Sequence, residues 1–149
     1  MRIRAIRSIV VLGLLLGLGG LAACSAPSVE YSESNGSYTN SQTRLILERI
    51  DTSRFAKKPT SEASALRSKA LAQLRSQGAS AAVAADLITE TFPPGTRSVP
   101  VYVEKAVVEG TPSYVVIEAW GPTDGKLDRK RLWVITSETG DIIFSAAAR

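Results

Sequence analysis

Few residues in this sequence are equipped for covalent or acid–base chemistry. The 149 residues include one cysteine, Cys24, and no histidine. Without histidine, the chain has no Ser-His-Asp or Cys-His catalysis, no histidine metal site and no histidine pH switch. One cysteine also rules out an intramolecular disulfide. The Cys24 thiol is therefore the residue whose chemistry calls for an explanation.

Cys24 closes an N-terminal apolar segment. Residues 1–7 carry three arginines, and residues 9–21 (IVVLGLLLGLGGL) are apolar with only glycine interrupting. A positively charged start, a short apolar run and small residues at its end are typical of a secretory signal peptide. The run is shorter than the roughly 20 apolar residues of a transmembrane helix. We therefore expect a signal peptide over residues 1–23.

The four residues Leu21-Ala22-Ala23-Cys24 resemble the lipobox of bacterial lipoproteins, in which an aliphatic residue and two small ones precede the acceptor cysteine. The resemblance implies cleavage before Cys24 and a diacylglycerol in thioether linkage to its sulfur, with palmitate-type acyl chains, and two such chains suffice for stable anchoring. The mature protein would then be exported and lipid-anchored at the extracytoplasmic face of the cell membrane. The sequence also looks like the small lipoproteins of high-GC Gram-positive bacteria. The alternative is a plain secretory leader that ends beside a cysteine.

Charge argues against a nucleic-acid partner. Three of the 18 Lys and Arg residues precede Cys24, which leaves 15 basic residues against all 14 acidic ones in the rest of the chain. A nucleic-acid binder needs a surplus of basic side chains to displace counterions from phosphates. We expect no nucleic-acid binding.

The segment after Cys24 is polar. Residues 25–41 (SAPSVEYSESNGSYTNS) include six serines, and Val29 is the one branched aliphatic residue. Such a composition buries too little apolar surface to order a chain by itself. We expect residues 24–41 to comprise the lipidated cysteine and a flexible Ser-rich tether, with Tyr31 and Tyr38 as an alternative partner-binding motif.

The following half has helical periodicity. Apolar residues at helical spacing predict helices over about 42–52, 60–75 and 80–91, with Thr60 and Ser80 as N-caps and Gly78 as a left-handed helix end. Three basic residues of the middle helix are expected outside its apolar stripe, on a solvated face or, alternatively, against lipid headgroups: Arg67, Lys69 and Arg75.

From Ser98 the apolar period changes to two. The alternation predicts strands over about 99–107, 114–120, 131–136 and 142–145, joined by short turns, which is the pattern of an antiparallel meander. The expected architecture of residues 42–149 is a single α+β domain. Two or three helices (42–92) would pack on one face of a four-stranded antiparallel sheet (98–145).

The stretch 131–143 (RLWVITSETGDII) is similar to the end of PepSY-type domains, which close with an apolar strand, an acidic-X-Gly turn and a short aliphatic strand. The resemblance covers about residues 80–145, and its motif is a generic hairpin shared with other helix-on-sheet folds. It implies a non-catalytic extracytoplasmic module, of a type often linked to protease inhibition or signalling.

The second and third predicted strands carry the large aromatic residues. Tyr114, Glu118 and Trp120 share one strand face, and a hairpin centred near 126–127 would place Trp120 opposite Trp133. If helices cover one sheet face only, this face is either core or a partner surface. The candidate partner surface is Tyr114, Trp120 and Trp133.

The loop at 121–131 (GPTDGKLDRKR) concentrates charge, either as a solvated hairpin tip or as a contact for phosphates or an acidic partner. Asp124 and Asp128 lack the remaining ligands of a calcium loop, so we expect no metal and no cofactor. No nucleophile, base and oxyanion donor can be named together, so we expect no enzyme.

These observations favour a membrane-anchored, non-enzymatic binding or interaction module of the cell envelope. It would be held through acyl chains on Cys24 and offered to an envelope protein. The alternative is a small-ligand or lipid carrier with a pocket between helices and sheet. Oligomeric state stays open.

Overall fold

The computed structural model describes residues 28–93 and 95–149. The expected signal peptide and Cys24 lie outside the described residues. The described part contains the following elements: β1 (Glu30–Tyr38), α1 (Asn40–Arg49), α2 (Ala63–Arg75), α3 (Ala79–Thr91), β2 (Ser98–Val108), β3 (Thr111–Trp120), β4 (Arg129–Thr136) and β5 (Ile142–Ala148), with 3-10 turns at Ser53–Phe55 and Thr60–Glu62.

The five strands form one mixed sheet in the order β1-β2-β3-β4-β5. Strands β2 to β5 are the predicted antiparallel meander, and β1 adds a fifth strand parallel to β2. The α+β class is therefore confirmed. The expectation of a four-stranded, purely antiparallel sheet is wrong, because β1 reaches the sheet through the long connection that contains all three helices.

β1 lies where a flexible tether was expected. Glu30 pairs with Tyr102 of β2. Just before it, the Val29 amide donates to Gln73 Oε1 at 3.1 Å, and Gln77 Nε2 donates to the Val29 carbonyl at 3.1 Å. The strand pairing and the Val29 contacts use backbone groups, which polar composition does not predict. The flexible-tether prediction is therefore wrong for residues 30–41, and the ordered domain begins at least 12 residues before position 42.

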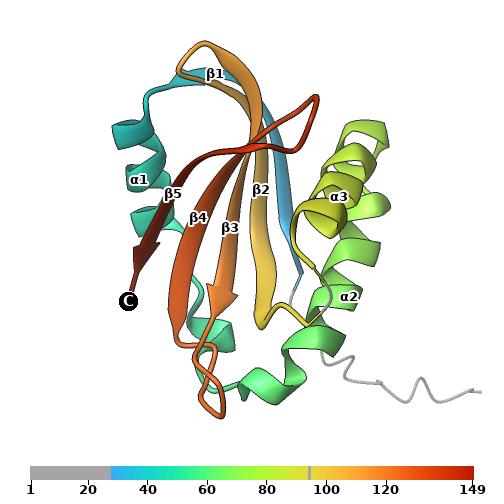
Figure 1. Cartoon of the computed structure of the whole chain (residues 1–149), viewed down its shortest axis with the longest axis vertical. Helices are drawn as coiled ribbons and strands as arrows, with labels where there is room; N and C mark the ends of the chain where they lie inside the picture. Colours follow the sequence, from blue (N-terminus) through green and yellow to red (C-terminus); the bar gives the residue numbers. More distant parts are fainter. Residues whose placement is uncertain (1–27, 94) are drawn as a thin grey trace, which may run out of the picture.

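The helices cover both faces of the sheet (Figure 1). α2 and α3 pack together on one face, and α1 packs against β4 and β5 on the other. α1 begins with a reciprocal capping box, in which Thr39 and Gln42 each accept a hydrogen bond from the other's backbone amide. Its Thr43, Ile46 and Leu47 are buried. The prediction that all helices lie on one face is wrong, because α1 supplies a second layer.

The boundaries of α2 and α3 differ from the prediction by a few residues. Thr60 begins a 3-10 turn instead of capping α2, which starts at Ala63. Ser80 lies inside α3, and Gly78 precedes that helix. Gly78 has a positive φ of 123°, but its ψ of 172° is extended and it caps the start of α3, so the prediction that it ends α2 in the left-handed conformation is wrong.

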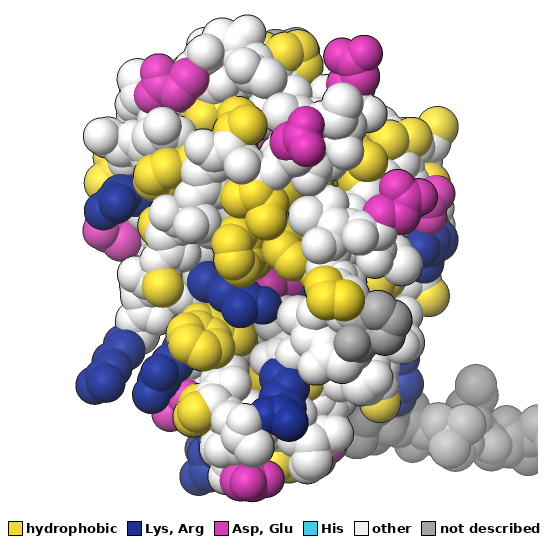
Figure 2. Space-filling model, in the orientation of Figure 1, with side chains coloured by type: hydrophobic (Ala, Val, Ile, Leu, Met, Phe, Trp, Pro, Cys, Tyr) yellow, Lys and Arg dark blue, Asp and Glu magenta, His cyan; other side chains and the backbone are white. Residues whose placement is uncertain are grey.

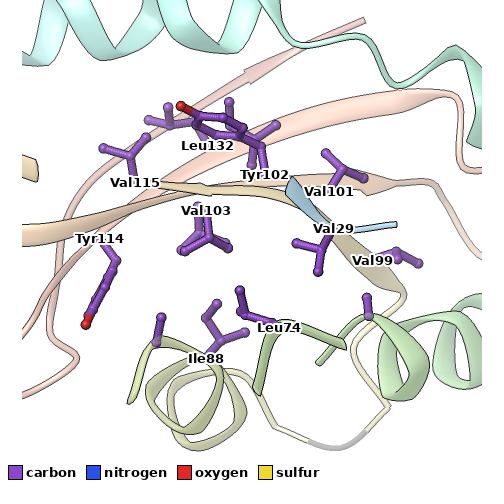
Figure 3. Packing of buried hydrophobic residues seen from close by; sticks show 14 of the residues in the cluster. Val29, Leu74, Ile88, Val99, Val101, Tyr102, Val103, Tyr114, Val115 and Leu132 are labelled. Atoms are coloured by element: carbon purple, nitrogen blue, oxygen red, sulfur yellow. The ribbon is translucent and has the colours of Figure 1, made fainter. Parts of the chain in front are cut away.

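The core has one part on each side of the sheet (Figure 3). Leu74, Ile88, Val103 and Tyr114 fill the space between the sheet and α2–α3. Tyr102, Val115 and Leu132 lie on the α1 side. Because side chains fill the first space, the structure gives no specific support to a carrier pocket at that interface.

Candidate functional site

The pairing of β3 with β4 decides which side chains meet on the α2–α3 face. Glu118 pairs with Arg131, Val116 with Trp133, and Trp120 with Arg129. The predicted pairing of Trp120 with Trp133 is therefore wrong, because residues 121–128 stay outside the ladder and move its centre toward the chain's N-terminal side. The predicted faces are right, since the shift preserves the two-residue alternation.

Glu118 lies at the centre of this face and is fully buried. Its Oε1 accepts from Arg67 Nη1 at 2.6 Å. Its Oε2 accepts from Ser98 Oγ at 2.9 Å, from Arg131 Nε at 3.0 Å and from Trp133 Nε1 at 3.0 Å. Four donors from α2, β2 and β4 thus converge on one carboxylate. We call Glu118, Arg67, Arg131, Ser98 and Trp133 the Glu118 cluster.

Arg67 is the buried cation of the cluster. It is 8% exposed, and its guanidinium also donates to the Ser98 carbonyl at 3.3 Å. Arg67 follows the buried Ala63 by four residues and precedes the buried Ala70 by three, so it lies within the apolar stripe of α2. The prediction that Arg67 lies outside the stripe is wrong. The helical spacing of Arg67 from Ala63 and Ala70 was the signal in the sequence that could have placed Arg67 among the buried residues.

The other two basic residues of α2 behave differently. Arg75 pairs with Asp86 of α3 at 2.9 Å across the helix surface. Lys69 is exposed, in agreement with a solvated face.

The cluster holds a negative charge inside the protein. Burial raises the pKa of Glu118, but the Arg67 and Arg131 charges, with the hydrogen bonds from Arg67 and Ser98, outweigh burial and hold that pKa below its usual value. One carboxylate faces two guanidinium groups, so the cluster carries an excess positive charge. Arg131 exposes 22% of its side chain, against 10% for Arg67, so it is the cation that meets solvent.

Arg131 lies between two indole rings. Its guanidinium carbon is 5.0 Å from the ring centre of Trp133 and 5.5 Å from that of Trp120. Arg129 lies over the same Trp120 ring at 5.4 Å. These distances suit cation–π attraction. We call Trp120, Arg129, Arg131 and Trp133 the Arg–Trp surface. Figure 2 shows basic and hydrophobic side chains side by side on the sheet face turned to the viewer.

The Arg–Trp surface borders a shallow hollow. Trp120, Arg129, Ala147, Ala148 and Arg149 line it, and its volume is about 300 Å³. Within the described residues, the buried Trp120 Nε1 has no hydrogen-bond acceptor. A buried N–H without an acceptor costs free energy. The surface thus offers two guanidinium groups, with one unsatisfied donor buried beneath it.

The structure divides the candidate partner surface predicted from the sequence. Tyr114 is 2% exposed, and its hydroxyl donates to the Ser80 carbonyl at 3.1 Å under α3. The prediction is therefore wrong for Tyr114, which is core. Trp120 and Trp133 are both half-buried. Trp133 packs on Phe92, with ring centres 5.1 Å apart.

The charged loop is a solvated hairpin tip, as one of the two readings predicted, since Asp124, Lys126 and Asp128 are exposed, and its backbone is also tied to the rest of the chain. The Leu127 amide donates to the Lys58 carbonyl at 2.9 Å, and the Thr60 amide donates to the Gly125 carbonyl at 3.0 Å. Lys130 Nζ donates to the carbonyls of Glu48 and Ile50 at the end of α1. Arg129 and Arg131 belong to β4, so a strand fixes their positions.

Residues 28–93 and 95–149 contain neither a metal-ligand cluster nor a membrane-spanning helix. No three His, Cys, Asp or Glu residues there come together as metal ligands. No helix in that part is long and apolar enough to cross a membrane.

Comparison with known proteins adds no identity. No family model matches the chain, and no curated protein or solved structure was found similar to it. The lipobox and PepSY-type resemblances therefore stay predictions.

Proposed function

We propose that this protein is a lipid-anchored, extracytoplasmic binding module without catalytic activity, and that its Arg–Trp surface binds an anionic partner of the cell envelope. The observation that carries the proposal is Arg131, a half-buried cation fixed between two tryptophans by the buried carboxylate of Glu118.

The cluster prepares Arg131 for binding before a partner arrives. An arginine that is already ordered loses less conformational entropy on binding than a free surface side chain. Arginine and tryptophan are also the residue types that most often dominate binding energy at interfaces. A surface with Arg129 and Arg131 close together favours a partner with carboxylate or phosphate groups, which the guanidinium fork matches.

To test the binding role, the acylated protein is immobilised and incubated with envelope extract. Arg129→Glu reverses one charge of the Arg–Trp surface without touching Glu118, and Lys69→Glu makes the same charge change on the exposed side of α2. We expect the wild type and Lys69→Glu to retain the same envelope component, and Arg129→Glu to lose it. Equal capture by both variants, or measurable turnover of an envelope substrate, contradicts the proposal.

The anchor is tested separately. Labelled palmitate should be incorporated into the wild-type chain and not into Cys24→Ser, and the substituted protein should leave the membrane fraction. A wild-type chain that takes up no label would sink the lipoprotein part of the proposal and leave the binding surface to be judged on its own.

A further inference from the structure

The end of the sheet at which β1 begins is the part of the domain closest to Cys24 along the chain. β1 and β2 are parallel, so both begin at this end, and Arg97 directly precedes β2. β3 ends and β4 begins at the same end, which places the loop 121–128 there. The Arg54 guanidinium donates to the Ser28 carbonyl, so Arg54 lies at the entry to β1.

Basic side chains gather at this end. The backbone of residues 58–60 is tied to the loop 121–128 by two hydrogen bonds and a β-bridge. Arg97 donates to Thr123 of the same loop. All the basic residues of these segments are exposed except Lys58, which is half-buried. We call the following five residues the basic end: Arg54, Lys57, Lys58, Arg97 and Lys126.

Charge is distributed unequally between the two ends of the sheet. The segments near Ser28 hold seven Lys and Arg against four Asp and Glu; these segments are residues 51–62, 97 and 121–130. The connections at the opposite end hold three acidic residues and no basic one; they are residues 39, 76–78, 109–110 and 137–141. In Figure 2, most basic side chains of the face shown lie in the lower half, toward the end at which β3 finishes in Figure 1. The four acids near Ser28 therefore reduce the positive charge of that end without reversing its sign.

We propose that the basic end lies against the anionic headgroups of the membrane in which Cys24 is anchored. The inference rests on the lipid anchor of the proposed function and uses none of the residues of the Arg–Trp surface. Residues 25–27 separate Cys24 from Ser28, and four Cα steps extend no further than about 14 Å. Anionic headgroups attract Lys and Arg within a Debye length, which is about 8 Å at physiological salt. The connection is thus short enough to hold the basic end where this attraction acts.

The contact would set the orientation of the domain. The strands run between the basic end and the acidic turns of the opposite end. They would therefore stand upright on the bilayer, with the acidic turns furthest from the headgroups. The Arg–Trp surface lies on a face of the sheet, so it would stay open to a partner beside the domain.

To test the contact, the full-length chain is coupled to vesicles through Cys24, its one cysteine, by a lipid that carries a maleimide group. This coupling does not depend on acylation in the cell, so the contact is judged separately from the palmitate experiment. Vesicles of phosphatidylcholine are compared with vesicles that also contain phosphatidylglycerol, an anionic lipid. An uncharged amine-acylating reagent is added, and the labelling of each lysine is followed by mass spectrometry.

The chain contains its own control lysines. Lys57 and Lys126 belong to the basic end, whereas the exposed Lys69 and Lys105 do not. On anionic vesicles we expect Lys57 and Lys126 to be labelled several-fold more slowly than on neutral ones, and the two control lysines at the same rate. Salt at about 0.5 M, which limits charge interactions to about 4 Å, should remove the difference. Equal labelling of Lys57 and Lys126 on both kinds of vesicle, or equal protection of all four lysines, would overturn the proposal.

Charge reversal then identifies the residues responsible. Arg97→Glu and Arg54→Glu each change the basic end, and Lys69→Glu makes a charge change of the same size outside it. In variants with the urea midpoint of the wild type, we expect each of the first two to lose about half of the protection of Lys57 and Lys126, and Lys69→Glu to keep it. Full protection in both arginine variants, or an equal loss in Lys69→Glu, overturns the assignment.

Discussion

Two buried carboxylates on opposite faces of the same sheet are stabilised by different partners. Glu118, on the α2–α3 face, accepts from two arginines, a serine and a tryptophan. Glu104, on the α1 face, accepts from two neutral hydroxyls, Tyr38 Oη at 2.8 Å and Tyr102 Oη at 2.8 Å. Both side chains are almost wholly excluded from solvent.

The difference separates a structural group from one that reaches the surface. At Glu104, the carboxylate and the two tyrosine hydroxyls form a hydrogen-bonded group without a charged partner. The arginines at Glu118 exceed its charge, and one of them continues outward between two indoles. A buried acid that holds a surface cation in place does more than stabilise a core, and variants of the two sites should behave differently.

The largest effect is expected for Glu118→Gln. This change removes the negative charge and leaves two guanidinium groups facing each other around a buried amide. We expect the free energy of unfolding to fall by about 3–5 kcal/mol. Glu104→Gln is the control and should lose about 1–2 kcal/mol, because an amide can still bond both tyrosines. Urea denaturation measures both, and equal losses would remove the distinction between the two sites.

The two arginines should themselves differ. Arg67→Met removes the buried cation from Glu118 and is expected to cost about 3 kcal/mol. Arg131→Met affects a more exposed group and should cost about 1 kcal/mol, yet it should abolish binding to the envelope component in the capture experiment. A large loss of stability with intact binding for Arg131→Met would reverse the roles assigned here.

Acid should destabilise the protein through Glu118. The pKa of Glu118 is lower in the folded protein than in the unfolded chain, so its stabilisation is present above about pH 4.3. That stabilisation is lost as pH falls through the folded-state pKa. In Glu118→Gln, the free energy of unfolding should therefore depend less on pH below about 4.3 than in the wild type. Parallel pH curves for the two proteins would contradict this assignment.

The smallest effect concerns the tyrosines at Glu104. Burial, followed by the hydrogen bond and the charge of Glu104, raises the pKa of Tyr102 above its usual value of 10.0. Its contribution to stability is therefore complete below pH 10 and declines as pH rises toward the folded-state pKa. Burial also raises the pKa of Tyr31, to about 12, so ultraviolet titration should show more than one late-ionising tyrosine, and one fewer in Tyr102→Phe. A titration unchanged by the substitution would refute the assignment.

Much of the fold followed from local pattern. Alternation between apolar and polar residues predicted the strands of the meander, and helical spacing placed α1, α2 and α3 close to their observed bounds. β1 could not be predicted in this way, since backbone pairing orders a polar segment 72 positions from its partner residue on β2. The packing of α1 on the other face of the sheet was not predicted, for a related reason. Local pattern does not say on which side of a sheet an amphipathic helix packs.

The site was predicted only in part. Trp120 and Trp133 were named as candidates from their type and face, and the structure leaves both half-buried. The partnership of Glu118 with Arg67 spans 51 positions between a strand and a helix, and no local spacing specifies it. Glu118 stood among apolar neighbours and Arg67 within an apolar stripe. Taken alone, each is a charged residue in an apolar stretch of sequence. Their pairing is seen only in the folded chain.

The hydrogen bonds of Gln73 and Gln77 to the Val29 backbone limit how far the domain can move from a membrane. Four residues, 25–28, separate Cys24 from Val29, and five Cα steps extend no further than about 18 Å. With acyl chains on Cys24, the domain would therefore work close to the headgroups, within reach of partners that also lie low on the bilayer.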